Sequence, residues 1–458
     1  MRESDTIAAI STAAAPAAIG ILRLSGPHAL DCAQGVFLPA DGRPLCEHPQ
    51  RKLIYGQLKD REGAVIDQVL CTYTRGPASY TGEDTAELQC HGSPMVLSLG
   101  LDALFAQGAR QAGPGEFTRR AFLNGQLDLV QAEAVADLLD AQSREGARQA
   151  AGQLGGALSR QLAGVYSALV DVMAHFCAAL DYPDEDIDPF RAEQLGASLT
   201  KQEKVLDRLL ASCRRGYQLK AGVPCAIVGR PNAGKSSLLN ALAGYERAIV
   251  TDIPGTTRDT VEVMVELGGL PLRLIDTAGL RDSQDPVEQL GVQRSRAAME
   301  QAQLIWVLWD GSLPFIQEDA ALLEQARKLA PTILIHSKSD LPAAPAPVLS
   351  GSPLPPVVAV SAKTGAGLNQ LEAAVAQLFP KDSAAPYGQL LTNQRQEDAA
   401  RRSRDSVRRA REALEAGITP DALLTDVEQA LASLGELTGQ SVREDITDRI
   451  FQRFCVGK

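Results

Sequence analysis

One stretch decides the fold of this chain: Gly229-Arg230-Pro231-Asn232-Ala233-Gly234-Lys235-Ser236. The apolar run Val223–Val228 before it predicts a buried strand, and Ser237–Ala243 after it predicts the start of a helix. Glycines let the backbone approach phosphate oxygens closely, so that successive N–H groups and the helix N-terminus face the anion. The pattern G-x-x-x-x-G-K-S in this setting therefore predicts a phosphate-binding loop.

Two side chains of this loop suit a bound nucleotide. Lys235 is placed to reach the β- and γ-phosphates, and the hydroxyl of Ser236 is placed to take one position on Mg²⁺. A glycine-rich strand–helix turn arising by chance is the alternative, which the fixed positions and their flanks disfavour. We expect these nucleotide-binding residues in the loop: Asn232, Ala233, Gly234, Lys235, Ser236 and Ser237.

Composition limits the class of protein. A chain of 458 residues is long enough for about three domains. Its formal net charge of −11 argues against general nucleic-acid binding, so an RNA contact needs a local patch. The eight cysteines contain no C-x-x-C pair, which favours reduced thiols in a cytoplasmic protein. No signal peptide follows Met1, and the most apolar helical stretch, Gly164–Leu180, is too short to span a membrane.

The first predicted domain, residues 1–118, has the pattern of a mixed α/β module. Strand-like runs alternate with a helical stretch, and three polar clusters are punctuated by Gly or Pro, which predicts loops or strand edges. Ordinary turn chemistry explains such clusters without any function. The three clusters are Ser79–Asp84, Glu87–Gly92 and Gly113–Arg120.

Helical patterns occupy residues 119–215 and 380–458, on both sides of the middle of the chain. In the first, apolar residues recur at three- and four-residue steps, as on an amphipathic helix. The second carries an arginine run, Arg395–Arg411, which is either an RNA-facing surface or a solvated face paired to acidic residues. Helices on both sides predict one helical domain with another unit inserted in it.

The middle of the chain, residues 216–379, alternates strand and helix, which predicts a parallel-rich sheet covered on both faces. The predicted strands are Val223–Val228, Val261–Leu267, Leu270–Ile275, Leu304–Trp309, Thr332–His336 and Val357–Val360. The expected fold class is therefore multidomain α/β plus α.

Two motifs after the phosphate loop are placed to be switches. Thr251–Asp259 fits a first switch, in which a threonine completes the Mg²⁺ shell. The Asp of the second motif can hold Mg²⁺ through water, and its last N–H can bond the γ-phosphate, a bond that is lost on hydrolysis. The second motif is Asp276-Thr277-Ala278-Gly279.

Two further motifs predict guanine as the base. In Ser337–Asp340, which follows a strand, Asp340 can accept both N–H donors of guanine and the stem of Lys338 can lie along the ring. The next strand is followed by Ser361-Ala362-Lys363, which fits the second guanine-contact loop. The order and spacing of all these motifs are those of a GTPase.

The residue after Asp276–Gly279 departs from Ras-like enzymes, where a Gln positions the attacking water. Leu280 stands here and cannot hydrogen-bond water, so another group must assist catalysis. The side-chain oxygen of Asn232 could hold a monovalent cation beside the phosphates. Glu288, in the second switch, could orient water.

These residues resemble one family, the tRNA-uridine-modifying GTPases called MnmE or TrmE. The resemblance covers essentially the whole chain, and the Cys-x-Gly-Lys ending is specific to this family among GTPases. The motifs that carry it are Gly229–Ser236, Thr251–Asp259, Asp276–Leu280, Phe454–Lys458, Ser79–Asp84, Glu87–Gly92, Gly115–Phe117 and Ala121–Asn124.

The resemblance implies an architecture and an activity. An N-terminal α+β tetrahydrofolate-binding and dimerisation domain would occupy residues 1–118. A helical domain, residues 119–215 and 380–458, would carry an inserted Ras-like P-loop GTPase domain, residues 216–379. The homodimer, with an FAD-dependent partner in a heterotetramer, would use GTP, Mg²⁺ and K⁺. It would add a carboxymethylaminomethyl (aminomethyl-type) group to C5 of the wobble uridine of certain tRNAs. The carbon donor would be 5,10-methylene- or 5-formyl-tetrahydrofolate.

The resemblance also implies roles for particular residues. Catalysis would depend on Glu288, which positions water, and on Lys235. The metal ligands would be Ser236 and Thr257 for Mg²⁺, and Asn232, Thr251, Ile253 and Thr256 for K⁺. The folate contacts would be Arg23, Glu87, Gln126 and Lys458, with Cys455 nearby. Cys455 is a candidate reactive thiol, and a buried structural cysteine is the alternative.

Some positions depart from the family pattern. Gln126 replaces a Lys at a folate contact, which weakens any charge pairing there. Ser337 replaces the Asn of the guanine motif, which predicts modestly weaker nucleotide binding. The early turn Ala13–Ala18 is alanine-rich, and Ser93 ends the usual His-Gly-Gly turn. The alternative function is a ribosome-assembly or regulatory GTPase switch without modification chemistry.

Overall fold

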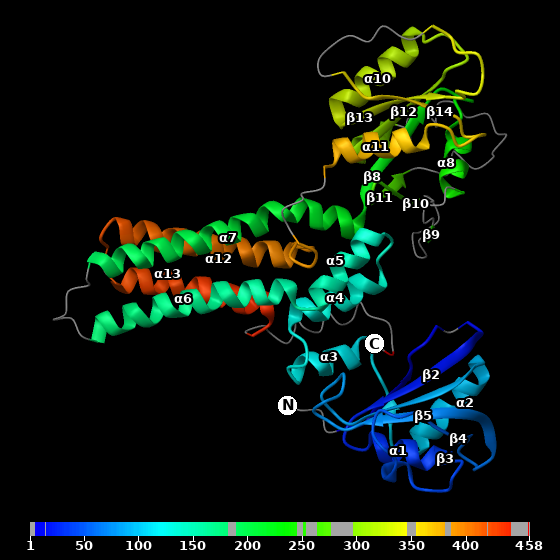
Figure 1. Cartoon of the computed structure of the whole chain (residues 1–458), viewed down its shortest axis with the longest axis vertical. Coiled ribbons are helices and arrows are strands. Elements are labelled where there is room, and N and C mark those ends of the chain that lie inside the picture. Colours follow the sequence, from blue (N-terminus) through cyan, green and yellow to red (C-terminus); the bar gives the residue numbers. More distant parts are fainter. Residues whose placement is uncertain are drawn as a thin grey trace. The chain divides into compact units, whose positions relative to one another are not determined.

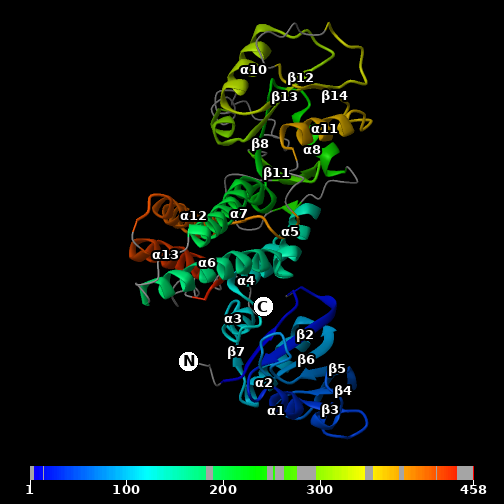
Figure 2. The ribbon, with the colours of Figure 1, turned by 60° about the vertical axis from the view of Figure 1, so that its left-hand side comes forward.

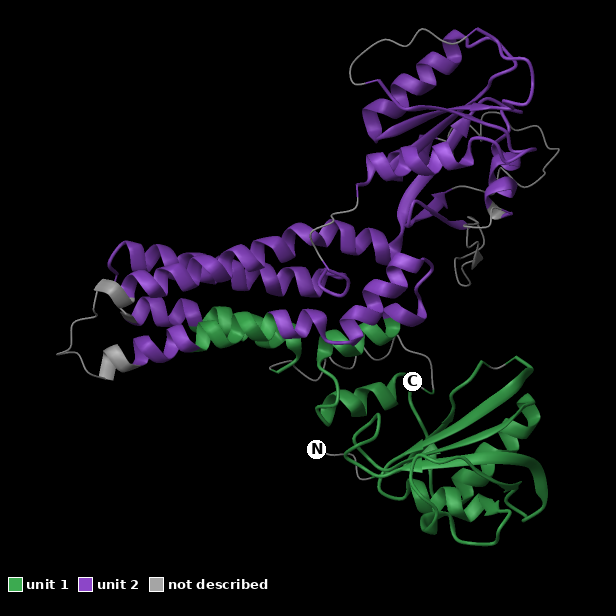
Figure 3. Cartoon of the chain, in the orientation of Figure 1, with its two compact units in different colours: residues 1–136, 162–170, 428–458 green, residues 137–161, 171–427 purple. Residues whose placement is uncertain are grey.

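The structure is a computed structural model. It describes residues 5–13, 15–181, 189–244, 251–252, 263–275, 296–345, 354–380, 386–418, 420–440 and 457. The chain forms two compact units (Figure 3), one of residues 1–136, 162–170 and 428–458 and the other of residues 137–161 and 171–427. Within the described ranges, every helix is too short or too polar to cross a lipid bilayer.

The first unit contains a seven-stranded sheet in the order β3-β4-β5-β6-β2-β1-β7 (Figure 1). All neighbours pair antiparallel except β1 and β7. The strands are β1 (Ile7–Ile10), β2 (Ala17–Ser25), β3 (Phe37–Pro39), β4 (Ile54–Lys59), β5 (Val65–Thr74), β6 (Thr85–Gly92) and β7 (Arg110–Gln111). Helices α1 (Ala29–Val36) and α2 (Pro94–Ala106) pack with the apolar strand residues into one core, and a short 3₁₀ turn spans Leu45–Glu47.

The expectation that Glu87–Gly92 forms a loop or a strand edge is wrong, because β6 lies inside the sheet between β5 and β2. Ala86, Leu88 and Cys90 are buried on one face, while the residues between them are more exposed. This period-two alternation of small or apolar residues with polar ones is a strand signal that the terminal glycine obscured. The polar cluster therefore lies along one face of a central strand.

The last of the three polar clusters forms the start of a helix, α3 (Glu116–Leu123), which the chain enters through the left-handed Gly115. The helix ends at Asn124-Gly125, where Asn124 caps α3 and Gly125 has a φ of 71°. Helix α4 (Leu129–Leu139) follows. Two further helices, α6 (Ala157–Asp181) and α13 (Pro420–Thr438), contribute residues to both units.

The second unit contains a sheet in the order β14-β13-β12-β8-β11-β10-β9. Strands β14, β13, β12, β8 and β11 are parallel, as predicted, whereas β10 and β9 pair antiparallel. The strands are β8 (Val223–Gly229), β9 (Thr251–Asp252), β10 (Val263–Leu267), β11 (Leu270–Ile275), β12 (Leu304–Asp310), β13 (Thr332–Ser337) and β14 (Val357–Val360).

Helices cover both faces of this sheet (Figure 2). Apolar side chains of α8 (Lys235–Ala243) and α11 (Leu368–Leu378) form one core with the strands. On the opposite face, Leu323 and Ala326 of α10 (Gln317–Leu329) join a second core. Parallel strands buried on both faces read as continuous apolar runs, which is why the sequence located them within a residue or two.

The rest of the second unit includes α5 (Arg144–Leu154) and two long helices, α7 (Pro189–Ala221) and α12 (Gln394–Glu415), that pack along each other. The arginine run lies on α12. Several of its guanidinium groups pair with acids of neighbouring helices: Arg404 with Asp207, Arg408 and Arg411 with Glu203, and Arg409 with Asp426. The structure therefore favours the paired solvated face over the RNA-facing surface.

The segment that returns from the second sheet to α12 is held by glutamine side chains. Gln153 Nε2 donates to the carbonyl of Leu390 at 2.6 Å, and Gln149 Oε1 accepts from the N–H of Gly388 at 2.8 Å. A Cβ at Gly216 would lie 1.9 Å from the carbonyl oxygen of Leu391, so only glycine allows α7 to approach this closely. Gly216 of α7 and Leu391 before α12 thus lie side by side.

Candidate nucleotide-binding site

The phosphate loop joins β8 to α8, as predicted. β8 is buried between β11 and β12, and its last residue opens the loop at the carboxyl end of the sheet. Gly234 caps α8 with a φ of 92°, a conformation that other residues seldom adopt, and Asn232 is held at a φ of 61°. Ligands of open parallel sheets bind outside this edge, at the N-termini of the helices that follow the strands.

Lys235 folds back onto the loop that carries it. Its Nζ donates to the carbonyl oxygens of Gly229 at 2.8 Å and Arg230 at 2.9 Å. Burial lowers the pKa of the Lys235 ammonium, because a charge taken from water without a counter-ion is destabilised. An anion bound in the loop would supply that counter-charge, so the site suits phosphate groups.

Asp340 and Ser361, predicted from separate motifs, come together. The hydroxyl of Ser361 donates to Asp340 Oδ1 at 2.7 Å. This hydrogen bond, with one from the backbone, holds the pKa of Asp340 below its usual range, so the carboxylate stays ionised near neutral pH. An ionised carboxylate can accept two N–H donors, which is the pattern that one edge of guanine presents.

Lys338 is anchored by an acid that the sequence analysis missed. Its Nζ donates to Asp310 Oδ2 at 2.6 Å, and Asp310 also accepts from the backbone N–H and the hydroxyl of Ser312. Burial raises the pKa of Asp310, but these donors outweigh it and leave the pKa lowered. The available signal was that Asp310 directly follows the predicted strand Leu304–Trp309; its position opposite Ser337 comes from the register of the sheet.

Ser337 ties the phosphate loop to the sheet. Its Oγ lies 2.6 Å from the carbonyl oxygen of Ala233 and 3.1 Å from that of Trp309. A hydroxyl carries one hydrogen and donates to one of these acceptors at a time, whereas the amide of the usual Asn has two. The serine therefore retains the tie between the loops with one donor fewer.

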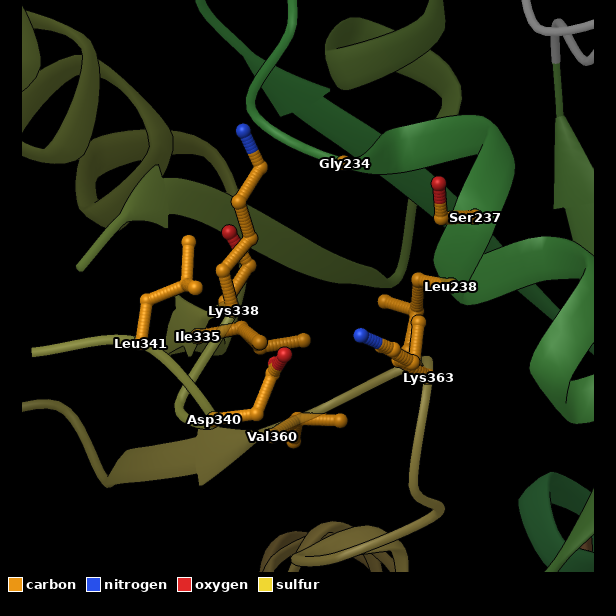
Figure 4. A pocket seen from close by; sticks show the side chains of 11 residues that line it. Gly234, Ser237, Leu238, Ile335, Lys338, Asp340, Leu341, Val360 and Lys363 are labelled. Atoms are coloured by element: carbon orange, nitrogen blue, oxygen red, sulfur yellow. The ribbon is translucent and has the colours of Figure 1, made fainter. Parts of the chain in front are cut away.

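These loops enclose a cavity of about 210 Å³. Figure 4 shows Lys338 and Asp340 from the loop after β13, Lys363 from the loop after β14, and Ser237 from α8 around the same space. The remaining lining residues are Gly234, Leu238, Ile335, Ser337, Leu341, Val360 and Ala362. Motifs more than 100 residues apart thus meet as the GTPase interpretation requires, with phosphate-loop and base-contact residues in one cavity.

The remaining residues predicted for this site lie outside the described residues. Only the backbone of Thr251, in β9, is described. Roles predicted for the others, in Mg²⁺, K⁺ and γ-phosphate contacts and in catalysis, stay predictions. These residues are Ile253, Thr256, Thr257, Asp276, Thr277, Ala278, Gly279, Leu280 and Glu288.

A second group of predicted residues comes together in the first unit. Arg23 Nε donates to Glu87 Oε1 at 2.8 Å, because β2 and β6 pair with these two residues in register. Arg23 Nη1 lies 3.4 Å from the carbonyl oxygen of Gly457, and its guanidinium carbon lies 5.8 Å from the ring centre of Phe117. Lys458 and Cys455 lie outside the described residues, so their predicted roles at this cluster stay predictions.

Gly457 shows why the chain ends with a glycine motif. Its φ is 99°, and a Cβ there would lie 2.4 Å from the carbonyl oxygen of Ile10. Its own carbonyl oxygen accepts from the hydroxyl of Ser11 at 3.0 Å. The close backbone approach therefore requires glycine at this position, and Gly457 itself lies against Ile10, which ends β1, and Ser11 after it.

The other polar clusters are joined by ion pairs and hydrogen bonds. Arg120, 2% exposed, donates to the carboxylates of Glu83 at 3.1 Å, Asp5 at 2.8 Å and Glu116 at 2.9 Å. Tyr80 and Thr118 also share a hydrogen bond of 3.0 Å. Turn chemistry alone does not explain clusters that pair with each other. Gln126, the other predicted folate contact, lies beside the loop of Gly82.

The sequence matches known proteins along its full length. It matches the profile of the MnmE helical domain over residues 129–455 and that of the GTP-binding protein TrmE N-terminus over residues 6–126. It is 44% identical over 471 residues to the tRNA modification GTPase MnmE of Roseiflexus sp. (strain RS-1), covering 100% of both chains. The same-named protein of Chloroflexus aurantiacus is 44% identical over 458 residues, 99% of this chain and 100% of that one.

Among solved structures, the chain is similar to the G domain of the T. maritima FeoB iron transporter, at 24% identity and a TM-score of 0.25. That likeness covers 34% of this chain and 98% of the other. The two profiles together span nearly all of the sequence, and the curated relatives align from end to end. The resemblance, the fold class and the GTPase enzyme class expected from the sequence are thereby confirmed. The chain belongs to the MnmE family of tRNA modification GTPases.

Proposed function

We propose that this protein is a K⁺-activated GTPase that modifies C5 of the wobble uridine of certain tRNAs together with an FAD-dependent partner. The observation that carries the GTPase part is that Gly234, Ser237, Lys338 and Asp340 line one and the same cavity. The tRNA part rests on end-to-end similarity to tRNA modification GTPases. The group added would be of the carboxymethylaminomethyl type, and the working form a cytoplasmic homodimer in a heterotetramer with the partner.

Some residues of this chain would bind GTP, and others would catalyse its hydrolysis. Lys235 would exchange its backbone carbonyl acceptors for the β- and γ-phosphates, while Asp340 and Lys338 hold the base. Ser236 and Thr257 would bind Mg²⁺, which neutralises charge on the phosphates. Glu288 would orient the attacking water, because Leu280 cannot.

K⁺ would be held by Asn232 together with Thr251, Ile253 and Thr256. Asn232 fits this role in one respect that the structure describes: its left-handed backbone sits in the phosphate loop, next to the residue that Ser337 ties down. A cation there would add positive charge at the phosphates, where other GTPases use an arginine finger.

The first unit would bind the folate that supplies the one-carbon group. Arg23, Glu87 and the Gly457 backbone offer a cation, an acceptor carboxylate and a carbonyl within one cluster, beside the ring of Phe117. A folate has glutamate carboxylates, N–H donors and a flat ring, so these groups match it chemically. Lys458, Gln126 and Cys455 would complete the site. The proposed domains have boundaries at residues 118, 215 and 379.

The decisive experiment is nucleoside analysis of tRNA after depletion of the protein. Loss of the C5 modification of wobble uridine, restored by the wild-type chain, supports the proposal. Unchanged wobble uridines would instead favour a regulatory or ribosome-assembly GTPase switch. Guanine-nucleotide binding by the purified chain tests the other half of the proposal independently.

A further inference from the structure

The phosphate loop is held from outside by an ion pair that its sequence pattern does not require. Arg230, at an unspecified x position of the loop, donates from Nε to Asp319 Oδ1 at 2.8 Å. Asp319 is 2% exposed, and its other carboxylate oxygen accepts from the backbone N–H of Ile316 at 3.1 Å. A buried carboxylate with defined donors is a rigid partner for an arginine.

Asp319 belongs to an element that the core fixes. It lies in the first turn of α10, whose Leu323 and Ala326 are buried in one core cluster with Trp309 of β12 and Leu334 of β13. The ion pair therefore connects the second residue of the phosphate loop to the sheet through a packed helix.

The other end of the loop has its own anchor, the hydrogen bond from Ser337 to the carbonyl oxygen of Ala233. Between the two anchors lie Pro231 and Asn232, and Asn232 adopts a φ of 61°. Asparagine adopts a left-handed conformation more readily than other residues with a Cβ but has other accessible conformations, so keeping this one in a loop needs a constraint. The two anchors supply that constraint.

We propose that Arg230 and Asp319 are a positioning pair that holds the phosphate loop, and Asn232 within it, in the anion-binding conformation. Neither residue needs to touch the nucleotide. The pair acts through the backbone by reducing the number of loop conformations that compete with the bound one. This inference rests on the proposed GTPase function and adds to it the residues that pre-organise its phosphate site.

A purely structural role in α10 is the competing explanation, since Asp319 also caps that helix. Asp319→Asn retains an acceptor for the Ile316 N–H but turns an amide N–H₂ toward Arg230. Glu318→Gln is the matched control, because it removes a neighbouring negative charge at an exposed position of the same turn. Arg230→Met leaves the helix cap intact and keeps most of the side-chain stem. Arg230→Lys restores the charge.

The measurements are GDP affinity, the K⁺ concentration for half-maximal GTP hydrolysis, and the thermal unfolding midpoint. We expect Asp319→Asn and Arg230→Met to weaken GDP binding about tenfold or more, because hydrogen bonds between charged groups are the strong ones. Both should also raise the K⁺ requirement several-fold. The unfolding midpoint should fall, because a buried group loses its partner, and its value shows whether the variant is still folded at the assay temperature. Arg230→Lys should recover part of the loss. The double variant should be little worse than either single variant.

The inference is overturned if Arg230→Met has a GDP affinity and a K⁺ requirement within twofold of those of Glu318→Gln. This comparison holds even if Asp319→Asn fails to fold. A double variant whose losses simply add would also overturn it. If the wild-type chain binds no guanine nucleotide, the proposed function fails and takes this inference with it. If the wild type binds normally and the variants match it, this inference alone fails.

Discussion

Ser337, the first residue of the predicted guanine motif, links that motif to the phosphate loop through a single hydroxyl hydrogen. Replacing it with Ala removes the donor and leaves the carbonyl of Ala233 unpaired in a buried position. The loss of one such hydrogen bond, worth about 0.5–1.5 kcal/mol, should weaken GDP binding by roughly two- to tenfold. Ser337→Asn should bind at least as tightly as wild type, because the amide offers two donors. Fluorescent GDP titration measures both, and equal affinities for Ala and Ser would contradict the role.

Leu280 cannot hydrogen-bond water, so we propose that catalysis draws on a cation recruited by Asn232. Replacing K⁺ with Na⁺ at constant ionic strength should slow GTP hydrolysis about tenfold or more, since a charge at the arginine-finger position is worth roughly 10³–10⁵ in rate. GDP affinity should change little, which separates catalysis from binding. Equal turnover in both salts would remove the cation from the mechanism.

Helix α3 begins with an ionised residue whose environment predicts acid sensitivity. Burial raises the pKa of Glu116, but hydrogen bonds from Arg110, the N–H of Gly113 and Arg120 outweigh it and lower the pKa to about 2. In an unfolded chain the group titrates near 4.5. A depressed pKa stabilises the fold above the unfolded value, and this stabilisation is lost as the pH falls from about 4.5 toward 2.

Calorimetry across this pH range should therefore show the first unit losing stability, and Glu116→Gln should flatten the dependence. Trp306 and Trp309 are both buried in the second unit, so tryptophan fluorescence identifies that unit's transition and separates it from that of the first. Glu62→Gln, at an exposed turn, is the control. A pH dependence unchanged in Glu116→Gln would show that other groups cause it.

The ion pairs between α7 and α12 predict a contribution to stability that depends on salt. Glu203 accepts from Arg408 at 2.7 Å and from Arg411 at 2.9 Å, and its side chain is 12% exposed. Because it serves two guanidinium groups, Glu203→Gln should lower the free energy of unfolding by about 1 kcal/mol or more, and added salt should reduce the difference. Urea denaturation measures this. A variant as stable as wild type at low salt would show that these pairs contribute nothing.

Elements were predictable to different degrees, for physical reasons. β8 and β11–β13 are largely buried on both faces and read as apolar runs, so the sequence placed them closely. β6 was not recognised, because Glu87, Gln89, His91 and the terminal glycine resemble a polar loop when only Leu88 and Cys90 stand between them. The order of the guanine motifs predicted the base site, but the acid that anchors Lys338 depended on strand register, which the sequence does not show.

At the scale of the molecule, the least predictable contacts join residues far apart in the chain. Gly457 packs on Ile10 and Ser11 across nearly the whole sequence, and no local pattern reports such a pairing. The resemblance to a family implied only that Lys458 and Arg23 serve one folate site, and the steric demand for glycine explains the close approach of Gly457. The sequence predicted the inserted arrangement, because helical patterns flank an alternating α/β segment. The boundaries of the insert are still predictions.

Excision of the insert tests those boundaries. The second sheet has its own cores on both faces, so a fragment of residues 216–379 should fold and hydrolyse GTP. It loses the hydrogen bond from the Arg144 N–H to Glu266, 3.0 Å long, and should melt slightly below the intact chain. The remaining frame, residues 1–215 and 380–458 closed by a short Gly-Ser linker, should stay helical, because Leu391 before α12 still donates its N–H to Ser212 of α7 at 3.3 Å. Circular dichroism and GTP turnover measure both products. A fragment that aggregates, or a frame without cooperative unfolding, would mean that the two parts form a single folding unit.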